Sequence, residues 1–345
     1  MRKEAWTMKS ILLSDRPYPG TSFDTDRVYS ENVLTALETE AGLDRTIYSS
    51  QEVLASPEKF AGVRYIFSTW GMPGLSEAEI ARCFPALQAV FYAAGSVQYF
   101  ARPFLNRGIS VFSAWAANAV PVAEYAAAQI VLANKGFFAA SRAMSTGDLP
   151  GGNAAKAAAW GNYGGCVGII GAGMVGKAVI RMLKHYNLRV LVFDPFLPDA
   201  AAAELGVEKC GLEELFVRCG VVSNHLANNE QTKGMLRGCH FAAMRPYATF
   251  LNTGRGAQVV EEELCRVLAE RPDLTAVLDV TEPEPPLADS PFYGLPNCIL
   301  SPHIAGSLGD EVCRMAEYML EEFRLYTAGK PTRYSVTLKM LETMA

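Results

Sequence analysis

Three glycines in one short segment have the spacing that points most directly to chemistry. Gly171, Gly173 and Gly176 occur in Val167-Gly-Ile-Ile-Gly-Ala-Gly-Met-Val-Gly176, between an apolar run and a stretch with helical spacing of apolar side chains. In such a turn the first glycine permits a tight bend, the second lets the backbone approach a pyrophosphate, and the third allows close helix–strand packing. The following helix would offer free N–H groups to phosphates. The segment therefore predicts a dinucleotide site.

An acidic residue follows at the spacing that such a site requires. Asp194 ends the next apolar run, 18 residues after Gly176. Its carboxylate can accept hydrogen bonds from a ribose 2′-OH and would repel a 2′-phosphate. Pro195 and Phe196 come next and supply no arginine to pair with a phosphate. NAD is therefore predicted rather than NADP, and a glycine-rich turn with an incidental surface aspartate is the alternative.

Proton transfer near neutral pH most often uses histidine, and this chain has four. His185 stands among polar residues after the predicted helix and is expected at the surface, while His240 has no evident partner. His225 and His303 each follow an apolar run, at what should be the carboxyl ends of strands. In open α/β sheets ligands bind at that edge. Position alone does not separate these two histidines.

Short apolar runs alternate with helix-like stretches along the chain. Most of the runs are continuous, which is typical of parallel strands covered on both faces. The alternation predicts βαβ units and therefore an α/β fold with doubly wound parallel sheets. The expected strands are 10–13, 63–69, 89–94, 109–113, 167–171, 189–194, 221–225, 249–252, 276–280 and 298–301.

A long alanine-rich stretch follows the first four expected strands. Residues 121–143 are apolar almost all round, which predicts a buried helix at a domain or subunit contact. Residues 147–165 are rich in turn formers and are expected to form turns. A last helix is expected over about 310–326, where it could return the chain to the first domain.

Length and composition restrict the class of protein. The 345 residues predict two domains, and a content of 50% hydrophobic and 19% charged residues allows a sizeable core. A net charge of -5 without a Lys/Arg block argues against nucleic-acid binding. No apolar run approaches the ~20 residues of a membrane span, and the run at Ile11 is too short for a signal peptide. A cytoplasmic protein without membrane partners is expected.

The eight cysteines do not predict a metal centre or a disulfide framework. They are scattered, and no CxxC pair occurs. Cys239 and His240 are adjacent, but neighbouring residues rarely ligate one metal well. Reduced, mostly buried thiols and no metal are therefore expected.

Three segments after the glycine turn resemble the D-isomer-specific 2-hydroxyacid dehydrogenase family, which includes glyoxylate/hydroxypyruvate reductases and phosphoglycerate dehydrogenases. They are Phe250-Leu-Asn-Thr-Gly-Arg-Gly256, Leu278-Asp-Val-Thr-Glu-Pro-Glu-Pro285 and Leu300-Ser-Pro-His-Ile-Ala-Gly306. The resemblance is strongest over about 118–306 and weaker over 1–117. It implies a Rossmann NAD domain at 118–305, inserted in a flavodoxin-like substrate domain made of 1–117 and 306–345. It also implies a homodimer, with 121–143 as the candidate contact.

The same resemblance implies a catalytic set of Arg255, Glu284 and His303 that acts on a small 2-keto or 2-hydroxy acid. Arg255 would bind the substrate carboxylate, because its planar fork suits paired oxygens. His303 would donate a proton during reduction and accept one during oxidation, and Glu284 would orient it and favour its charged form. Glu282 is a nearby competitor, but the family pattern assigns the role to Glu284, 19 residues before the histidine.

Further contacts are implied by the resemblance alone. The backbone at Ala94, Gly95 and Ser96 would bind substrate, although the usual glycine pattern is altered there. Trp70 suits a pocket wall or the core equally. Asn224 and Ala227 depart from the residues common in the family. Additional cofactor contacts are implied at Met174, Val175, His225, Ala227, Thr232, Thr253, Gly254, Asp279 and Gly306.

Two other functions share parts of this pattern. A corepressor-like, NAD-responsive binding protein would keep the fold and the three catalytic side chains, but such proteins usually carry extra segments for partners. This chain has little spare length for them. A formate dehydrogenase fits poorly, because that relative carries glutamine where Glu284 stands. The sequence therefore favours an NAD-dependent dehydrogenase of a small 2-hydroxy acid.

Overall fold

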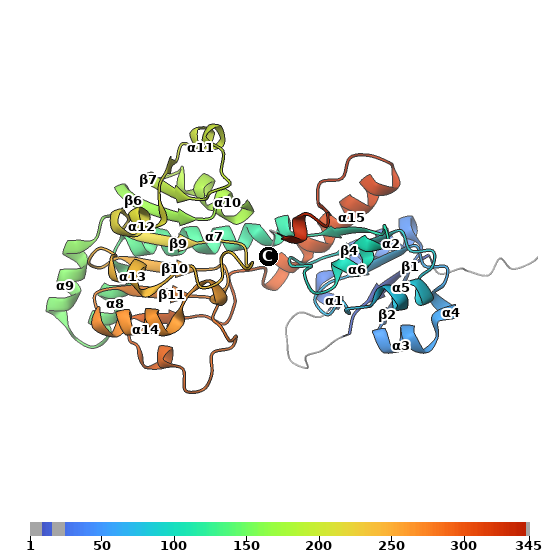
Figure 1. Ribbon diagram of the computed structural model, residues 1–345, viewed down its shortest axis with the longest axis horizontal. Coiled ribbons are helices and arrows are strands. Elements are labelled where there is room, and N and C mark those ends of the chain that lie inside the picture. The colour runs from blue at the N-terminus through green and yellow to red at the C-terminus, as the bar shows by residue number, and fades with distance from the viewer. Residues whose placement is uncertain (1–8, 16–24, 343–345) are drawn as a thin grey trace, which may run out of the picture. The chain divides into compact units, whose positions relative to one another are not determined.

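The computed structural model describes residues 9–15 and 25–342, and these form two compact units (Figure 1). Unit 1 contains the described residues up to Asn118 and those from Ser307 onward, and unit 2 runs from Ala119 to Gly306. The expected bounds, 118–305 for the inserted domain, differ from these by one residue at each junction. Each unit has a sheet with helices packed on it.

Unit 1 is built on short, buried strands. They are β1 (Ser10–Leu13), β2 (Leu43–Tyr48), β3 (Tyr65–Ser68), β4 (Ala89–Tyr92), β5 (Ser110–Ser113) and β13 (Ser335–Val336). Among the described residues they form one sheet in the order β13-β5-β4-β3-β1-β2, in which only β13 runs antiparallel. The order of its parallel strands, 2-1-3-4-5, is that of flavodoxin-like domains. Its helices are α1 (Thr25–Val28), α2 (Glu31–Ala41), α3 (Ser50–Ala55), α4 (Pro57–Phe60), α5 (Glu77–Cys83), α6 (Ala101–Asn106) and α15 (Cys313–Thr327).

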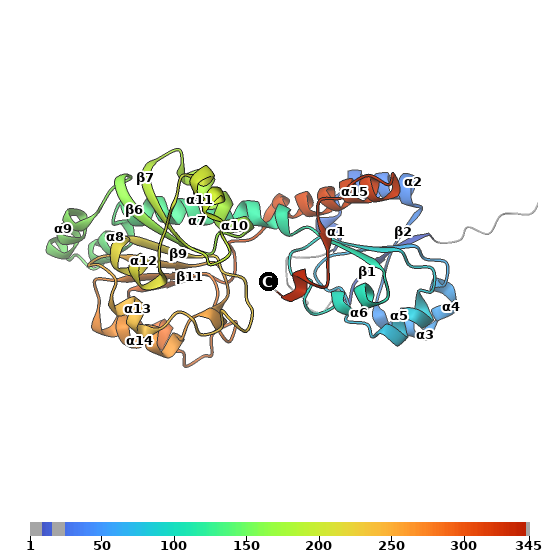
Figure 2. The ribbon, with the colours of Figure 1, turned by 45° about the horizontal axis from the view of Figure 1, so that its top comes forward.

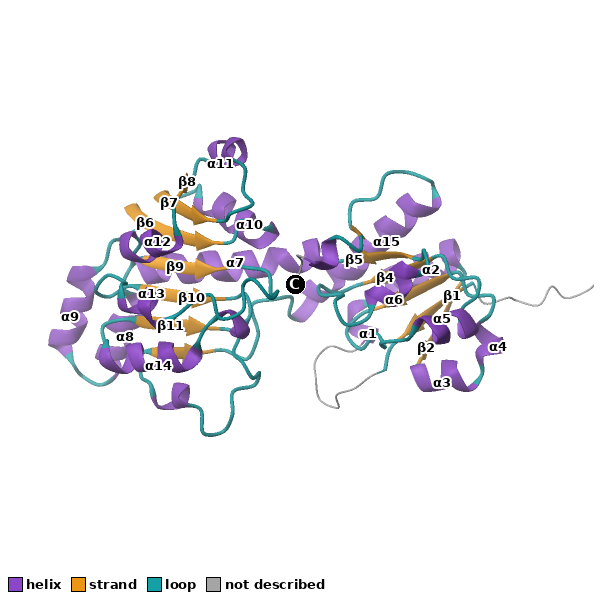
Figure 3. Ribbon diagram, viewed as in Figure 1, coloured by secondary structure: helices purple, strands orange, loops and turns teal. Residues whose placement is uncertain are grey.

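Unit 2 contains a fully parallel sheet, whose strands lie side by side in Figure 3. The strands are β6 (Tyr163–Ile170), β7 (Asn187–Phe193), β8 (Glu208–Lys209), β9 (Val221–Asn224), β10 (Thr249–Asn252), β11 (Thr275–Leu278) and β12 (Cys298–Leu300). Their order is β12-β11-β10-β9-β6-β7-β8, so the direction of winding reverses between β6 and β9. This is the Rossmann order with one added strand, and ligands bind at such a reversal.

Helices cover both faces of this second sheet (Figure 2). They are α7 (Trp115–Asn134, which begins in unit 1), α8 (Phe137–Ser145), α9 (Leu149–Ala158), α10 (Met174–Leu183), α11 (Asp199–Leu205), α12 (Leu212–Arg218), α13 (Gly238–Ala242) and α14 (Glu261–Glu270). Residues of β6 that follow one another pack in different hydrophobic cores, one on each face of the sheet. Val167 and Ile169 pack with α7, α10 and α11, whereas Ile170 packs with α12, α13 and α14. Burial on both faces explains why these strands are continuous apolar runs.

The alanine-rich stretch differs from its prediction. The expected helix over 121–143 is two helices: α7 begins six residues before Pro121, and α8 starts only after Gly136. Gly136 adopts a left-handed φ of 69°, which ends the first helix and turns the chain. Residues 147–165, expected as turns, contain α9, whose N-terminus is capped by the Asp148 carboxylate on the Gly151 N–H at 2.9 Å.

Helix α7 also corrects the prediction that no apolar stretch approaches the length of a membrane span. Among the described residues it is the one helix that is long and apolar enough to cross a membrane, judged by length and composition alone. Core helices meet the same criterion. Ala123, Ala126 and Ile130 of α7 are fully buried in the core of unit 2, so the criterion is weak evidence here.

Candidate active site

The glycine turn joins β6 to α10 at the reversal point of the second sheet. Gly171 has a left-handed φ of 87°, and a methyl group there would lie 2.9 Å from the His225 carbonyl oxygen. A methyl group on Gly176 would lie 2.0 Å from the Gly171 carbonyl oxygen, so the helix can approach the strand only without a side chain. At Gly173, by contrast, no atom lies within 4 Å of that position. The turn is thus packed on its protein side and open where a phosphate group would approach.

Asp194 lies directly after β7, beside this turn. Its Oδ2 accepts the Ala172 N–H at 2.7 Å, and its Oδ1 accepts the Phe196 N–H at 2.8 Å. The carboxylate therefore braces the glycine turn, a role that its position in the sequence did not suggest. Because each carboxylate oxygen has two lone pairs, both oxygens can still accept a further donor such as a ribose hydroxyl.

His225 follows β9 and is buried between two hydroxyl groups. Its Nε2 lies 2.9 Å from Ser223 Oγ, and its Nδ1 lies 3.1 Å from Thr253 Oγ1. Burial lowers the pKa of His225 to about 3, because no carboxylate offsets the lost hydration of the charged ring. This imidazole is therefore neutral at physiological pH and cannot serve as a proton donor.

A buried amide network under the β10 loop was missed from sequence. Asn224 Nδ2 donates to Asn252 Oδ1 at 2.9 Å and to Gln258 Oε1 at 2.6 Å. Gln258 Nε2 donates to the carbonyl oxygens of Leu226 and Ala227, and Gln258 Oε1 accepts the Arg255 N–H at 3.1 Å. The network fixes the backbone on both sides of Arg255. The polar residues Ser223 and Asn224 at the end of this buried strand were the available signal.

Arg255 follows β10, and most of the N–H donors of its guanidinium have no partner among the described residues. Nη1 donates to the Gly254 carbonyl oxygen at 2.7 Å, and within residues 9–15 and 25–342 no other hydrogen bond is found for this group. Burial lowers the pKa of Arg255, and the negative charge of Glu284 opposes that shift. A half-buried guanidinium with free donors is suited to bind a carboxylate.

The residues after β11, 279–285, form a segment that we call the glutamate loop. Its backbone passes directly over Gly256, where a methyl group would lie 2.0 Å from the Thr281 carbonyl carbon. Thr281 Oγ1 donates to the Pro283 carbonyl oxygen at 2.9 Å. The close approach at Gly256 places the neighbouring Arg255 beside the loop that carries Glu284.

Asp279, at the start of the glutamate loop, organises the segment after β12. Its buried carboxylate accepts Ser301 Oγ–H at 2.6 Å and the N–H groups of Ile304 and Ala305 at 2.9 Å each. The Asp279 carbonyl oxygen accepts the His303 N–H at 3.0 Å. These bonds hold His303 at a φ of 54°, a strained conformation for a residue with a side chain.

The structure brings His303 and Glu284 together. His303 Nδ1 lies 2.6 Å from Glu284 Oε1, and both side chains are partly exposed. Glu282, the competing residue, donates its backbone N–H to Glu261 Oε1, and within the described residues no contact between its carboxylate and His303 is found. Since Nδ1 faces the carboxylate, Nε2 is the nitrogen that remains for another molecule. The arrangement is that of an acid–base histidine oriented by a carboxylate.

The other expected site residues lie where their strands end. Met174 and Val175 open α10, and Gly306 closes unit 2. Thr232 Oγ1 donates to the Ala227 carbonyl oxygen at 2.7 Å and so closes the loop after β9. Gly254 is held by its N–H on Asn252 Oδ1 at 3.0 Å.

The expected substrate segment lies in unit 1, after β4. Ser113 Oγ donates to the carbonyl oxygens of Ala94 and Gly95, at 2.9 and 2.6 Å. In the described part of the chain the N–H groups of Ala94, Gly95 and Ser96 make no hydrogen bond. Trp70 packs against the core of unit 1 and is half-buried. This segment therefore presents free backbone donors on a fixed turn.

The remaining histidines and the cysteines do not gather into a metal centre. His240 stacks on Phe216, and its Nδ1 accepts the Arg237 N–H at 3.0 Å, while His185 is exposed. No group of three or more His, Cys, Asp or Glu side chains suited to a metal ion occurs among residues 9–15 and 25–342. Four cysteines are buried, three are half-buried and Cys239 is exposed.

Comparison with known proteins identifies the family. Residues 127–305 match the family profile "D-isomer specific 2-hydroxyacid dehydrogenase, NAD binding domain". The chain belongs to this family. The match confirms the predicted family and NAD as the predicted cofactor class, and the glycine turn lies within the matched residues.

Named relatives of this 2-hydroxyacid dehydrogenase family member agree with that assignment. A glyoxylate reductase of Korarchaeum cryptofilum is 30% identical over 256 residues, which cover 74% of this chain and 77% of the relative. A D-3-phosphoglycerate dehydrogenase of Archaeoglobus fulgidus is 29% identical over 237 residues, or 69% of this chain and 44% of the relative. The chain thus spans less than half the length of that phosphoglycerate dehydrogenase.

A solved structure confirms the predicted fold. A phosphoglycerate oxidoreductase from Rhizobium etli superposes with a TM-score of 0.77 at 25% identity, over 95% of this chain and 97% of that one. The α/β class with two doubly wound sheets, predicted from the apolar runs, is therefore correct.

Proposed function

We propose that this chain is an NAD-dependent dehydrogenase that interconverts a small 2-keto acid and its 2-hydroxy acid, with the D stereochemistry that its family implies. The observation that carries the proposal is the 2.6 Å contact between His303 Nδ1 and Glu284 Oε1. This pair lies on the sheet edge that also holds the glycine turn and the open guanidinium of Arg255.

The proposed reduction uses three side chains. Arg255 binds the substrate carboxylate through its unengaged donors and holds the carbonyl group near His303. His303 donates the Nε2 proton to the carbonyl oxygen as that oxygen gains an electron pair, and Glu284 accepts the Nδ1–H and stabilises the imidazolium beforehand. When bound, NADH supplies the hydride for the carbonyl carbon. In oxidation, neutral His303 removes the hydroxyl proton.

We infer that the cofactor is NAD(H) rather than NADP(H). The open backbone at Gly173 and the N-terminus of α10 would hold the pyrophosphate. The Asp194 carboxylate, braced by two backbone N–H groups, would accept the ribose hydroxyls and repel a 2′-phosphate.

Unit 1 is proposed as the substrate domain and unit 2 as the NAD domain. The unbonded N–H groups of Ala94, Gly95 and Ser96 would bind substrate. The carbonyl groups of Ala94 and Gly95 are fixed by Ser113, so these donors are already ordered. The altered sequence of this turn predicts a substrate preference that differs from that of the named relatives.

We also propose a cytoplasmic homodimer. The helices α7, α8 and α9 carry large apolar side chains that are exposed in a single chain, as expected for a surface covered by a second copy. These are Leu132, Phe137, Met144 and Leu149, with exposures of 38, 48, 52 and 57%. Sedimentation velocity should give a dimer mass, and a monomer at micromolar concentration would refute this assembly.

The deciding experiment is a panel of keto acids with NADH and with NADPH. Glyoxylate, hydroxypyruvate, pyruvate and bulkier 2-keto acids are each mixed with the purified protein, and absorbance at 340 nm is followed. We expect turnover with NADH on at least one small acid. Binding of NADH without turnover of any acid would instead support the corepressor-like alternative, which the dehydrogenase and reductase names of the relatives do not favour.

A further inference from the structure

The glutamate loop has few attachments to the rest of unit 2 between Thr281 and Pro285. Thr281 bonds within the loop itself, and Gly256 contributes a packing contact without a hydrogen bond. The Glu282 N–H, however, donates to Glu261 Oε1 at 2.9 Å. Within residues 9–15 and 25–342 this is the one hydrogen bond that ties the stretch 281–283 to a helix. Glu261 thus holds the chain two residues before Glu284.

Glu261 is placed for this contact by α14, of which it is the first residue. The helix is anchored by Leu264 and Leu268, which are buried in the core beneath the sheet. The Glu261 side chain is half-buried, whereas that of the neighbouring Glu262 is exposed. A rigid helix therefore presents one carboxylate to the backbone of a loop.

We propose that Glu261 is a positioning residue for the acid–base pair: its carboxylate holds the Glu282 N–H and so keeps Glu284 on His303. The inference rests on the proposed function, because it assigns Glu261 to the same reaction. A charged acceptor makes a stronger hydrogen bond than a neutral one. Loss of the charge on Glu261 therefore loosens the loop that orients the imidazole.

The charge on Glu261 changes in the physiological range. Burial raises the pKa of Glu261 to about 7, the Glu282 N–H opposes this shift, and the negative charge of Glu282 adds to it. The titratable groups near Glu261 are Glu282 on the loop, Cys298 on β12, and Cys265 and Glu262 on α14. His240 and Arg237, at α13, lie toward Glu263 instead. Within the described residues no cation lowers the pKa of Glu261, so none keeps this carboxylate charged at low pH.

The way in which folding stability from Glu261 changes with pH argues against a purely structural role for its carboxylate. Since the ordinary pKa is 4.5, the folded chain holds this proton more tightly than the unfolded chain between pH 4.5 and about 7. Folding stability from this group therefore falls as pH rises through that window. At pH 8 the charged form is unfavourable for folding, yet it is the form that holds the loop best.

The test compares Glu261→Gln and Glu261→Leu with the control Glu262→Gln on the same helical turn. The ratio of wild-type kcat/KM for keto-acid reduction to that of Glu261→Gln should fall about tenfold as pH drops from 8 to 6, the change expected when a charged acceptor becomes neutral. The ratio cancels the pH dependence of proton donation, which both proteins share. Glu261→Gln should match wild type at pH 6 and be about tenfold slower at pH 8, with NADH affinity unchanged. Glu262→Gln should keep the wild-type profile.

Hydrogen exchange of the glutamate loop gives a readout that does not need turnover. After correction for intrinsic exchange, the wild-type backbone N–H groups of Thr281, Glu282 and Glu284 should be better protected at pH 8 than at pH 6, and Glu261→Gln should show no such difference. Pro283 and Pro285 have no N–H to exchange. An active Glu261→Gln enzyme that keeps the wild-type pH profile and protection overturns the inference and leaves the proposed function intact. A wild-type protein that turns over no keto acid overturns the proposed function, and the exchange data then judge the loop contact alone.

Discussion

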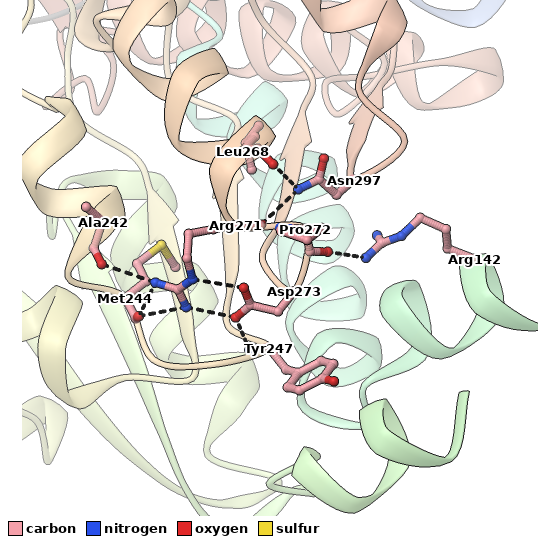
Figure 4. Close-up of polar contacts among 9 residues, drawn as sticks. All are labelled: Arg142, Ala242, Met244, Tyr247, Leu268, Arg271, Pro272, Asp273 and Asn297. Carbon is pink, nitrogen blue, oxygen red and sulfur yellow. Dashed lines mark hydrogen bonds and ion pairs between the residues drawn. The ribbon is translucent and has the colours of Figure 1, made fainter. Parts of the chain in front are cut away.

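The strands β10, β11 and β12 start at one edge of the sheet, the amino edge, and end at the opposite one, the carboxyl edge. A network of hydrogen bonds around Arg271 lies at the amino edge, and it contrasts with the candidate site at the carboxyl edge. At the amino edge, Arg271 is saturated (Figure 4): its guanidinium bonds both oxygens of Asp273 at 2.8 Å each and also donates to the carbonyl oxygens of Ala242 and Met244. Tyr247 N–H adds a donor to Asp273 at 3.2 Å. The side-chain bonds to Asp273 raise the pKa of Arg271.

At the carboxyl edge of the same strands, the Arg255 guanidinium makes one hydrogen bond within the described residues, and burial lowers the pKa of Arg255. The amino edge thus satisfies its charges internally, whereas the carboxyl edge leaves donors unpaired and keeps His303 in a strained conformation. Saturated groups stabilise a fold, and unsaturated ones are available to bind a ligand. We therefore assign stability to the first edge and chemistry to the second.

Removal of the proton donor should produce the largest effect. His303→Ala should lower kcat for keto-acid reduction by about 10³-fold, because general acid catalysis is lost. NADH affinity, measured by fluorescence titration, should change little, since the glycine turn is untouched. His185→Ala, on an exposed residue of the same unit, serves as the control and should keep wild-type kinetics. Wild-type turnover by His303→Ala would refute the assignment of the carboxyl edge.

Replacement of each arginine by lysine tests the contrast directly. Arg255→Lys should reduce kcat/KM for keto acids by roughly 100-fold, because a point charge cannot bind a carboxylate through two parallel N–H donors. Arg271→Lys should leave kcat/KM within about twofold of wild type, since its contacts lie at the opposite edge. Equal catalytic losses in both variants would show that the edges are not functionally distinct.

Asp194 is expected to control cofactor choice. Asp194→Asn removes the charge and keeps an acceptor for only one of the Ala172 and Phe196 N–H groups, because its amide nitrogen donates. A turn loosened by the lost bond would weaken the use of NADH and NADPH alike, so the ratio between the two cofactors reports on the charge. The ratio of kcat/KM with NADH to that with NADPH should fall by about tenfold, because repulsion of the 2′-phosphate is lost. An unchanged ratio would mean that the carboxylate only braces the turn.

The fold was largely predictable because its signals are local. Strands buried on both faces, such as β4 and β11, are short and mostly apolar runs. The edge strand β2 was missed, since its Leu-Asp-Arg-Thr-Ile-Tyr sequence is partly polar and exposed. Helix α9 was missed because its first turn contains Pro150 and two glycines. The Asp148 cap and the packing of Gly152 against Met144 support the helix in the structure.

The site was predictable only where its signals are local in the sequence. The glycine turn is a local motif, and its geometry follows from adjacent residues. Burial, however, is a tertiary property, so the sequence left His225 and His303 equivalent by position. The bonds from Gln258 to the carbonyl oxygens of Leu226 and Ala227, and from Asp279 to the His303 segment, join residues on different loops. No spacing rule could reveal them.

The amino edge should respond in stability rather than in rate. Arg271→Ala removes the pair with Asp273 and leaves carbonyl oxygens without donors, which should lower the free energy of unfolding by about 1–2 kcal/mol. That loss corresponds to a fall in Tm of roughly 2–8 °C for a domain of this size, measurable by calorimetry. Arg255→Ala should shift Tm less. The contrast between the edges would be broken if Arg255→Ala destabilised the protein more than Arg271→Ala.

The smallest effect concerns His225, which sits at the carboxyl edge but is saturated like the residues of the amino edge. Because its folded pKa is about 3 and its ordinary value is 6.5, the unfolded chain binds this proton more readily between those values. Stability should therefore fall as pH drops from 6.5, by up to about 1.4 kcal/mol per pH unit from this one group. His225→Gln should flatten that dependence in urea unfolding at pH 4.5 to 6.5. An identical slope in wild type and His225→Gln would indicate that the ring is charged in the folded chain, and the saturation argument would then fail for His225.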